Sequence, residues 1–451
     1  MWIRGLNVKY LLLVLAASLF VACVPQEQVQ VKKENISIEE EDIVIEDLVK
    51  IPQDISYYVK DINTSKLYDI QKKYEASYFS VWDIQKPPLS LKETQWPFEA
   101  FNSSKSYGEN LQPLEEDFFD AMRVQSNPHA YATLNKKALT IKHANIRAFP
   151  TNKPLLRDPS IAGEGFPFDY LQNSSINANV PLFISHYSLD KQWVFVFNSF
   201  TFGWLQTNEI VFINDMHADK WKNAQQIMIV KEGVPLYSKE GLALFNTKIG
   251  MMFALISEDE DAYTILSVSR YKNHQAMFHK SIIKKDVGSK GVLIFNQENI
   301  QSILGEISKT KYGWGGVYGQ RDCSSTLMDF YTPFGIWLPR NSSMQAKVGE
   351  VLNLRKLNDE DKIQFIKEEA VPFQTLLYRK GHIVLYAGIF EEEIIVYQNV
   401  WGIRTKKDAQ EGRFIIGKAV FSTLKLGDEL EDYDESAELL RNIESMNIIT
   451  K

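Results

Sequence analysis

The chain has 451 residues and a formal net charge of -7. At roughly 150 residues per domain, this length predicts about three domains. Its hydrophobic content of 45% and charged content of 24% are those of an ordinary globular protein. A nucleic-acid-binding protein would concentrate basic side chains on one surface, so the negative charge argues against that class.

The N-terminus carries the pattern of a secretion signal. Arg4 and Lys9 precede an apolar stretch, residues 11–22, which is too short to cross a bilayer and suits a signal peptide. The stretch ends in LFVAC at residues 19–23, which resembles a bacterial lipoprotein cleavage box with phenylalanine in place of the more usual leucine. We therefore predict a signal peptide over residues 1–23 and lipid attachment at Cys23; an ordinary secretion signal is the alternative. Residues 24–46 are polar and acidic without apolar periodicity, which predicts a tether.

The next three stretches differ in texture and carry no catalytic cluster. Residues 47–140 have a mostly helical pattern, whereas residues 141–215 and 216–288 hold short apolar runs separated by turns, which is typical of strands. The chain contains no H-E-x-x-H, P-loop or dinucleotide-binding pattern, so we expect no metal site and no cofactor. The histidines of these stretches are at no metal-ligand spacing: His186, His217, His274 and His279.

A candidate nucleophile follows a glycine-rich turn. The turn is Gly313-Trp314-Gly315-Gly316, and Asp322 then precedes Cys323 at the start of an apolar-periodic run. Because aspartate is a favoured N-cap, Cys323 is predicted to lie at a helix N-terminus. The helix dipole and free N–H groups there favour a thiolate and can stabilise an oxyanion.

Two predicted strands supply the groups that such a cysteine needs. They are GHIVLYAG (residues 381–388), which begins with His382, and IIVYQNVW (residues 394–401). If His382 and Gln398 lie on one face of an antiparallel hairpin, Gln398 can orient the imidazole. A register slip of one residue would present Asn399 instead, and the sequence leaves both open.

These motifs together resemble a known family. YGWGG before DCSS, followed by LPRNSSMQ, GHIVLYAG and YQNVWG, is similar to the NlpC-type papain-like cell-wall endopeptidases, and to their subgroup with SH3-like domains before the catalytic domain. The resemblance implies an α+β fold in which a helix bearing the cysteine packs on an antiparallel sheet. It also implies that Cys323 attacks, His382 is the base and Gln398 orients it. The expected domains are a helical stabilising domain (47–140), two small SH3-like β-barrels (141–215 and 216–288), the papain-like domain (289–435) and a tail (436–451).

The resemblance also implies a substrate. Members of the subgroup cut the γ-D-glutamyl to diamino acid bond of peptidoglycan stem peptides and require a free N-terminal L-alanine. The positions that bind this amine in relatives match Tyr312, Asp322 and Ser324, and a carboxylate with two hydroxyls can satisfy the three donors of an ammonium. We expect residues 166–170 of the first SH3-like domain to close the pocket. We also expect a monomer in the cell envelope, anchored by lipid on the periplasmic or external side of a membrane.

Other interpretations stay open at this point. The protein could be a non-catalytic lipoprotein that binds wall peptides and has a vestigial papain-like domain, or a cysteine amidase or acyltransferase on the same fold. Asp322 could be only an N-cap, and Arg340 could simply hold the loop after the helix. The intact cysteine and histidine favour the peptidase.

Overall fold

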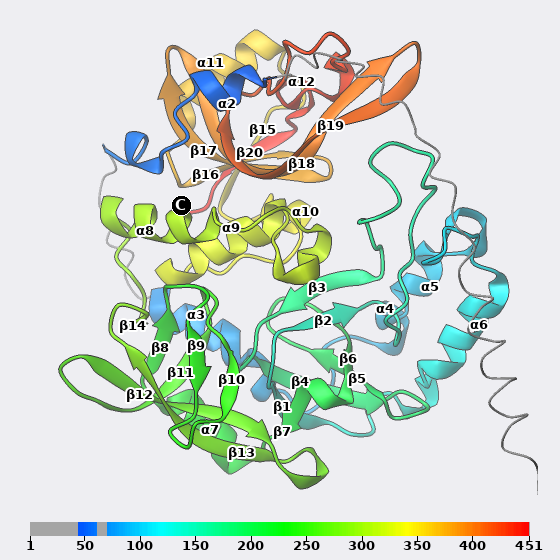
Figure 1. Ribbon diagram of the computed structural model, residues 1–451, viewed down its shortest axis with the longest axis vertical. Helices are drawn as coiled ribbons and strands as arrows, with labels where there is room; N and C mark the ends of the chain where they lie inside the picture. Colours follow the sequence, from blue (N-terminus) through cyan, green and yellow to red (C-terminus); the bar gives the residue numbers. More distant parts are fainter. Residues whose placement is uncertain (1–43, 61–69, 451) are drawn as a thin grey trace, which may run out of the picture. The chain divides into compact units, whose positions relative to one another are not determined.

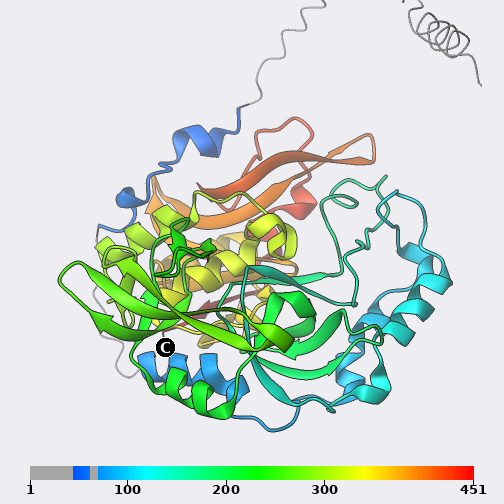
Figure 2. The same cartoon turned by 60° about the horizontal axis from the view of Figure 1, so that its bottom comes forward.

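A computed structural model describes residues 44–60 and 70–450 of the chain (Figures 1 and 2). The predicted signal peptide, Cys23 and nearly all of the predicted tether lie outside the described residues. The chain from Val44 onward forms one compact unit. Within the described ranges, no helix has both the length and the apolar character needed to cross a membrane.

The first β domain is a seven-stranded antiparallel sheet in the order β3-β2-β6-β5-β4-β1-β7. Its strands are short and rich in Val, Ile and Phe, which suit a pleated surface that is covered on both sides. All five residues of β5 are buried for this reason. The bounds are β1 Lys136–Thr140, β2 Ala144–Arg147, β3 Gln172–Ile176, β4 Pro181–Tyr187, β5 Trp193–Phe197, β6 Phe202–Gln206 and β7 Ile210–Phe212.

The second β domain follows helix α7 (Asp215–Asn223) and holds a five-stranded sheet in the order β13-β12-β11-β8-β14. A two-stranded sheet, β10-β9, lies beside it and shares its apolar core. Two SH3-like β domains were predicted, and both are present. The bounds are β8 Gln226–Ile229, β9 Pro235–Tyr237, β10 Ala243–Asn246, β11 Met252–Glu258, β12 Ala262–Arg270, β13 Ala276–Lys284 and β14 Gly288–Lys290.

The N-terminal helices pack against three different parts of the molecule. The turn after α2 places Tyr58 on Phe421 of the C-terminal sheet, with ring centroids 4.5 Å apart. Helix α3 buries Tyr78 and Phe79 in a core that both β domains share, and α6 packs Phe119 against Phe149 of the first. Figure 1 shows these blue and cyan helices spread along the molecule. The bounds are α2 Glu46–Lys50, α3 Ile70–Phe79, α4 Leu91–Thr94, α5 Trp96–Ala100 and α6 Glu116–Gln125.

The C-terminal domain is a six-stranded antiparallel sheet with helices on both faces. Ile383 and Leu385 of β17 belong to the core with α8 and α9, whereas Val384 and Tyr386 belong to the core with α11 and α12. This alternation is the period-2 pattern of a strand buried on both sides, and it confirms the predicted papain-like arrangement of a helix on an antiparallel sheet. The sheet order is β15-β20-β16-β17-β18-β19.

The elements of this domain have the following bounds. The helices are α8 Gln297–Ile307, α9 Cys323–Tyr331, α10 Ser342–Gln345, α11 Asp359–Glu369 and α12 Leu439–Asn442. The strands are β15 Glu350–Asn353, β16 Thr375–Arg379, β17 His382–Phe390, β18 Glu393–Lys407, β19 Gln410–Ser422 and β20 Ser445–Ile448.

Two expectations about the course of the chain are wrong. Residues 436–451 are not a tail, because β20 pairs with both β15 and β16 inside the sheet and buries Met446 and Ile448. The strand β20 has only four residues, which is too few for the sequence to show a clear period-2 pattern. The mostly helical stretch also ends earlier than expected, since residues 136–140 form β1 of the first β domain.

Candidate active site

Cys323 is the first residue of α9, as the sequence predicted. Asp322 caps the helix: its Oδ1 accepts a hydrogen bond from the Ser325 N–H at 2.8 Å, and its own N–H donates to Ser325 Oγ at 2.9 Å. This reciprocal pair satisfies two groups at the helix start and fixes where the helix begins. The partly exposed Cys323 side chain lines an open pocket of about 550 Å³.

The turn before the cysteine packs closely on the first β domain. Gly315 and Gly316 have φ angles of +61° and +82°, which few residues other than glycine adopt. A Cβ on Gly316 would lie 2.2 Å from Oγ of Ser175 in β3, so only glycine fits there. The N–H of Gly315 donates to Asp322 Oδ2 at 3.1 Å. The turn therefore ties the cap of the catalytic helix to the first β domain.

His382 begins β17 and is oriented by Gln398. Its Nε2 lies 2.8 Å from Gln398 Oε1, and Gln398 Nε2 donates to Ser422 Oγ at 2.6 Å. Because the amide NH₂ group is directed at Ser422, Oε1 accepts the proton of His382 Nε2. Nδ1 is then unprotonated and can act as a base. Ser422 lies on β19, and no sequence pattern had pointed to it.

The register of the hairpin decides between the two candidate orienting residues. Leu385 pairs with Tyr397, so Gln398 shares a face with the strand end that carries His382. Asn399 points to the other face, where its Nδ2 donates to Arg321 O and Thr326 Oγ1, each at 2.9 Å. Gln398 contacts the imidazole, and Asn399 holds the start of α9.

The cysteine and the histidine line adjacent pockets. The pocket of Cys323 and the pocket of His382 share Tyr312 and Gly381. The thiol sulfur accepts the backbone N–H of Ile383, the residue after His382. Among the described residues, no hydrogen bond joins the thiol to the imidazole. The two groups are therefore brought to one cleft without a direct bond in this state.

Both reactive groups are neutral near pH 7. Burial, together with the negative charge of Asp322, raises the pKa of Cys323 to about 12. Burial lowers the pKa of His382 to about 4, and the hydrogen bond to Gln398 offsets this shift only in part. These shifts oppose the thiolate that the helix N-terminus favours. The site suits proton transfer from the thiol to Nδ1 during attack.

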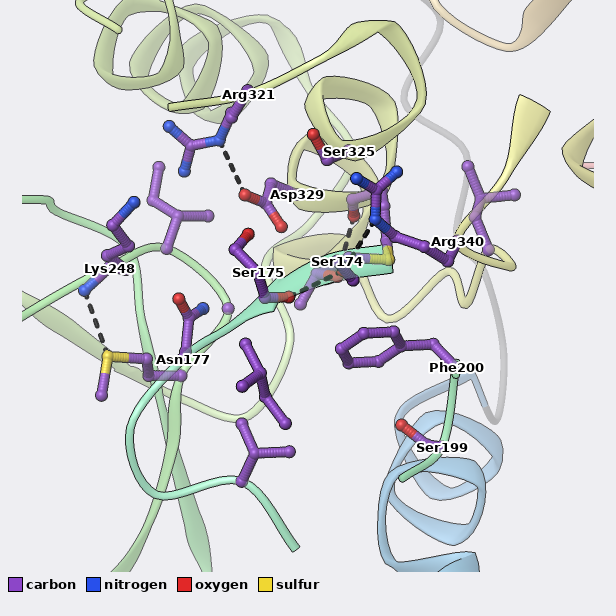
Figure 3. Close-up of a pocket in the computed structure, with 18 of the residues that line it drawn as sticks. Ser174, Ser175, Asn177, Ser199, Phe200, Lys248, Arg321, Ser325, Asp329 and Arg340 are labelled. Carbon is purple, nitrogen blue, oxygen red and sulfur yellow. Dashed lines mark hydrogen bonds and ion pairs between the residues drawn. The ribbon is translucent and has the colours of Figure 1, made fainter. Parts of the chain in front are cut away.

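Asp322 forms a buried ion pair that the sequence analysis did not anticipate. Arg340 Nη2 donates to Asp322 Oδ2 at 2.7 Å, and Nη1 donates to Oδ1 at 3.2 Å and to Ser324 Oγ at 3.0 Å. Arg340 Nε donates to Ser174 Oγ at 2.8 Å, and Figure 3 shows this arginine above Ser174. Tyr312, Asp322 and Ser324 do line the pocket of Cys323, but the carboxylate of Asp322 is already paired with Arg340.

A second buried ion cluster joins α9 to the second β domain. Arg321 is 1% exposed; its Nε donates to Asp329 Oδ2 at 2.7 Å, and its terminal nitrogens donate to Glu232. A small cavity of about 70 Å³ lies beside this cluster. Figure 3 shows Lys248 near Arg321 at its edge. Arg340 thus connects the cysteine helix to the first β domain, and Arg321 connects it to the second.

The 166–170 loop of the first β domain reaches the pocket edge. The ring centroid of Phe168 lies 5.5 Å from that of Trp314 and 5.5 Å from that of Trp401. Tyr170 packs on Trp314 at 5.6 Å and lines the pocket of Cys323. The loop therefore contributes Tyr170 to the pocket of Cys323 and Phe168 to the pocket of His382, and closure of the pocket by this loop stays a prediction.

Four family models match consecutive stretches of the chain. The NLPC_P60 stabilising domain (N term) matches residues 12–131, and an SH3 domain of SH3b1 type matches residues 154–206. An SH3 domain of SH3b2 type matches residues 214–260, and the NlpC/P60 family matches residues 309–411. A search of curated proteins finds no match.

One solved structure shares the fold. An NlpC/P60 endopeptidase from Photobacterium damselae subsp. piscicida aligns with a TM-score of 0.78 at 21% identity, covering 89% of this chain and 98% of its own. An NlpC/P60 family protein from Bacillus cereus aligns with a TM-score of 0.48 at 15% identity, covering 70% of this chain and 100% of its own. The first alignment shows that the two proteins share a fold. The chain is therefore a member of the NlpC/P60 family, in which a stabilising domain and two SH3 domains precede the catalytic domain.

Proposed function

We propose that the protein is a cysteine peptidase of the bacterial cell wall that hydrolyses the γ-D-glutamyl to diamino acid bond of stem peptides. Membership of the NlpC/P60 family supports the broader class. The observation that carries the proposal is the hydrogen-bonded chain from Ser422 through Gln398 to His382, at the cleft that also holds Cys323.

The geometry supports a two-step acyl transfer. His382 Nδ1 takes the thiol proton while Cys323 Sγ attacks the γ-carbonyl carbon of D-glutamate. The N–H of Cys323, at the first position of α9, has no acceptor among the described residues and can stabilise the oxyanion. His382 then gives the proton to the leaving amine, and water hydrolyses the thioester with the imidazole again acting as base.

The preference for a free N-terminal L-alanine belongs to the same proposal. Tyr312 and Ser324 offer hydroxyls in the pocket of Cys323, and Asp322 supplies the carboxylate. Since Arg340 already holds both carboxylate oxygens, an ammonium would meet an ion pair rather than a free charge. We therefore propose that Arg340 tunes the preference for the amine, so that Arg340→Gln strengthens it.

The proposal also includes a lipid anchor at Cys23 that holds the enzyme at a membrane facing the wall. This residue lies outside the described part of the chain, and its support is the cleavage pattern at residues 19–23. The peptide substrate is the expected partner.

Product analysis of purified stem peptides tests the reaction. Wild-type protein should release L-Ala-D-Glu, identified by mass spectrometry, whereas Cys323→Ala and His382→Ala should each lower turnover by orders of magnitude. The double variant should be no worse than either single one, because the two residues act as a unit. His217→Ala, in helix α7 before the second β domain, is the matched control. Full hydrolysis by Cys323→Ala would refute the nucleophile.

Two further measurements separate the alternatives. Binding of stem peptides without turnover by the wild-type protein would support a non-catalytic wall-binding protein. Acetylating the alanine amine should slow hydrolysis if the pocket selects the amine, and equal rates on free and acetylated peptides would refute that preference.

A further inference from the structure

A second pocket opens on the histidine side of the cleft. Its volume is about 320 Å³, and its walls are His382, Gln398 and Trp401 together with the two hairpins β16–β17 and β18–β19. Four cationic side chains line it, Arg379, Lys380, Arg404 and Arg413, against a single carboxylate, that of Asp434. The acyl transfer itself does not use this excess of positive charge. Such a pocket is suited to binding an anionic group.

Arg379 faces the pocket beside the catalytic base. It is the direct cross-strand partner of His382, so both side chains lie on one face of the sheet. Its Nη1 donates to the carbonyl of Ala437 at 2.6 Å. Among residues 44–60 and 70–450, no carboxylate lies within ion-pair distance of Arg379.

Arg404 and Arg413 form a like-charged pair across β18 and β19. They are direct partners in the ladder, an arrangement that destabilises a sheet unless other groups compensate. Arg404 is compensated by Asp434 at 2.9 Å and by Glu411. Arg413 donates only to the carbonyl of Gly412, at 2.8 Å, and pairs with no carboxylate in the described chain. Arg413 is therefore held near Arg404 and forms no ion pair of its own with a residue of the described chain.

The surroundings of the two unpaired arginines disfavour their charge. Burial lowers the pKa of Arg379 and of Arg413, and the positive charge of Arg404 lowers both further. Around Arg413, the carboxylates of Glu411, Asp434 and Glu164 offset this shift only in part. Charge-assisted bonds from a guanidinium to a carboxylate are among the stronger hydrogen bonds in proteins, and they relieve the cost of a partly desolvated charge. A ligand carboxylate in this pocket would supply the missing partner.

The chemistry of the reaction decides which part of the substrate enters this pocket. The acyl group stays on Cys323, which lines the other pocket, whereas the leaving amine takes its proton from His382. The leaving fragment therefore extends on the side of His382. We infer that Arg379 and Arg413 bind a carboxylate of the leaving fragment and so select its diamino acid end; this inference rests on the proposed function.

A carboxylate can come from two places in that fragment. One is the side chain of a dicarboxylic diamino acid such as diaminopimelate, which lysine lacks. The other is the free C-terminus of a short stem. Four synthetic stems distinguish them: L-Ala-γ-D-Glu followed by diaminopimelate or by lysine, each with a free or an amidated C-terminus.

The ratio of kcat/KM between matched stems is the first measurement. For wild-type protein we expect at least tenfold faster cleavage of the stem that carries the recognised carboxylate than of its partner without it. Arg379→Gln and Arg413→Gln should each reduce this ratio to below threefold, mainly through KM. Lys407→Gln, an exposed cation at the far end of the β18–β19 hairpin, should keep the wild-type ratio. A wild-type ratio near one for both pairs of stems would overturn the inference, and so would an unchanged ratio in Arg413→Gln.

Binding of the leaving fragment alone keeps the test independent of turnover. Calorimetric titration of the Cys323→Ala variant with diaminopimelate, with lysine and with their amides should show tighter binding of the carboxylate-bearing member. Arg413→Gln in that background should abolish the difference. Equal binding would refute the pocket even where hydrolysis is observed, and absent hydrolysis with intact carboxylate binding would refute only the proposed reaction.

Discussion

Gln398 holds His382 in one tautomer because Ser422 fixes the orientation of its amide. Three side chains on three strands thus fix the tautomer in which Nδ1 of the imidazole is unprotonated. A neutral amide orients the ring without adding a charge, so the imidazole keeps the low pKa, about 4, that burial gives it. The base is then neutral, and ready to accept a proton, over most of the range in which the enzyme could work.

Replacement of Gln398 tests this arrangement. Gln398→Ala should lower kcat/KM partially, by on the order of 10²-fold or less, because the base itself remains. Gln398→Glu should raise the pKa of His382, since a carboxylate stabilises the imidazolium, and should move the acidic limb of the pH–rate profile upward from near pH 4. Asn399→Ala, which contacts α9 instead, should leave the limb in place. An unmoved limb in Gln398→Glu would contradict the orienting role.

At this scale the sequence predicts the candidate residues that meet at the cleft but not their electrostatics. Cys323 and His382 follow from local motifs, and the Asp322 cap follows from the start of the helix. The choice of Gln398 over Asn399 depends on the pairing register of β17 and β18, which a short sequence pattern does not fix. The pairing of Asp322 with Arg340, 18 residues later, depends on how the following loop folds back. The neutral thiol depends on tertiary burial, which no local rule supplies.

At the scale of elements, α9 is held from both sides by arginine pairs. Arg340 connects its N-terminus to β3 of the first SH3-like domain, and Arg321 connects it to Glu232 of the second. Asp329 of α9 also pairs with Arg321, so this arginine is shared between Asp329 and Glu232. Such buried clusters add little net stability when intact, but breaking one partner leaves an unpaired charge.

Removal of Arg321 should therefore be costly. Arg321→Met leaves the carboxylates of Glu232 and Asp329 without their shared partner, and we expect a loss of about 3–5 kcal/mol in the free energy of unfolding. Lys231→Gln is the matched control, because this neighbour of Glu232 forms only an exposed pair with Asp286 at 3.2 Å, which contributes about 0–1 kcal/mol. Denaturant unfolding measures both. A loss below about 1 kcal/mol in Arg321→Met would contradict the role of the cluster.

The sequence predicts the two β domains and the helix-on-sheet core well because their apolar patterns are local. It misses β20, whose four residues become a strand only by pairing with β15 and β16. Nor does a helical pattern indicate that α2 and α3 pack on different domains, since an amphipathic face does not specify its partner.

At the scale of the whole molecule, the N-terminal segment joins domains that are distant in sequence. Residues 44–60 pack on the catalytic domain, where Asp47 Oδ2 accepts the Thr423 N–H at 2.8 Å. The next helix, α3, packs between the two SH3-like domains, and α6 packs on the first of them. These N-terminal elements therefore contact each of the other domains in turn. An anchor at the N-terminus would then hold all of the domains near the membrane together.

The two cysteines of the chain permit a matched test of that attachment. Cys23→Ser should abolish incorporation of a labelled fatty acid and move the protein from the membrane fraction to the soluble one, because stable anchoring needs more than one acyl chain and none would be attached. Cys323→Ser removes the other thiol and should leave both labelling and fractionation unchanged while turnover is lost. The released Cys23→Ser protein should keep its kcat/KM on soluble stem peptides, since the active site is built from residues 312–422. If Cys23→Ser stays in the membrane fraction with normal processing, the anchor is not at this cysteine.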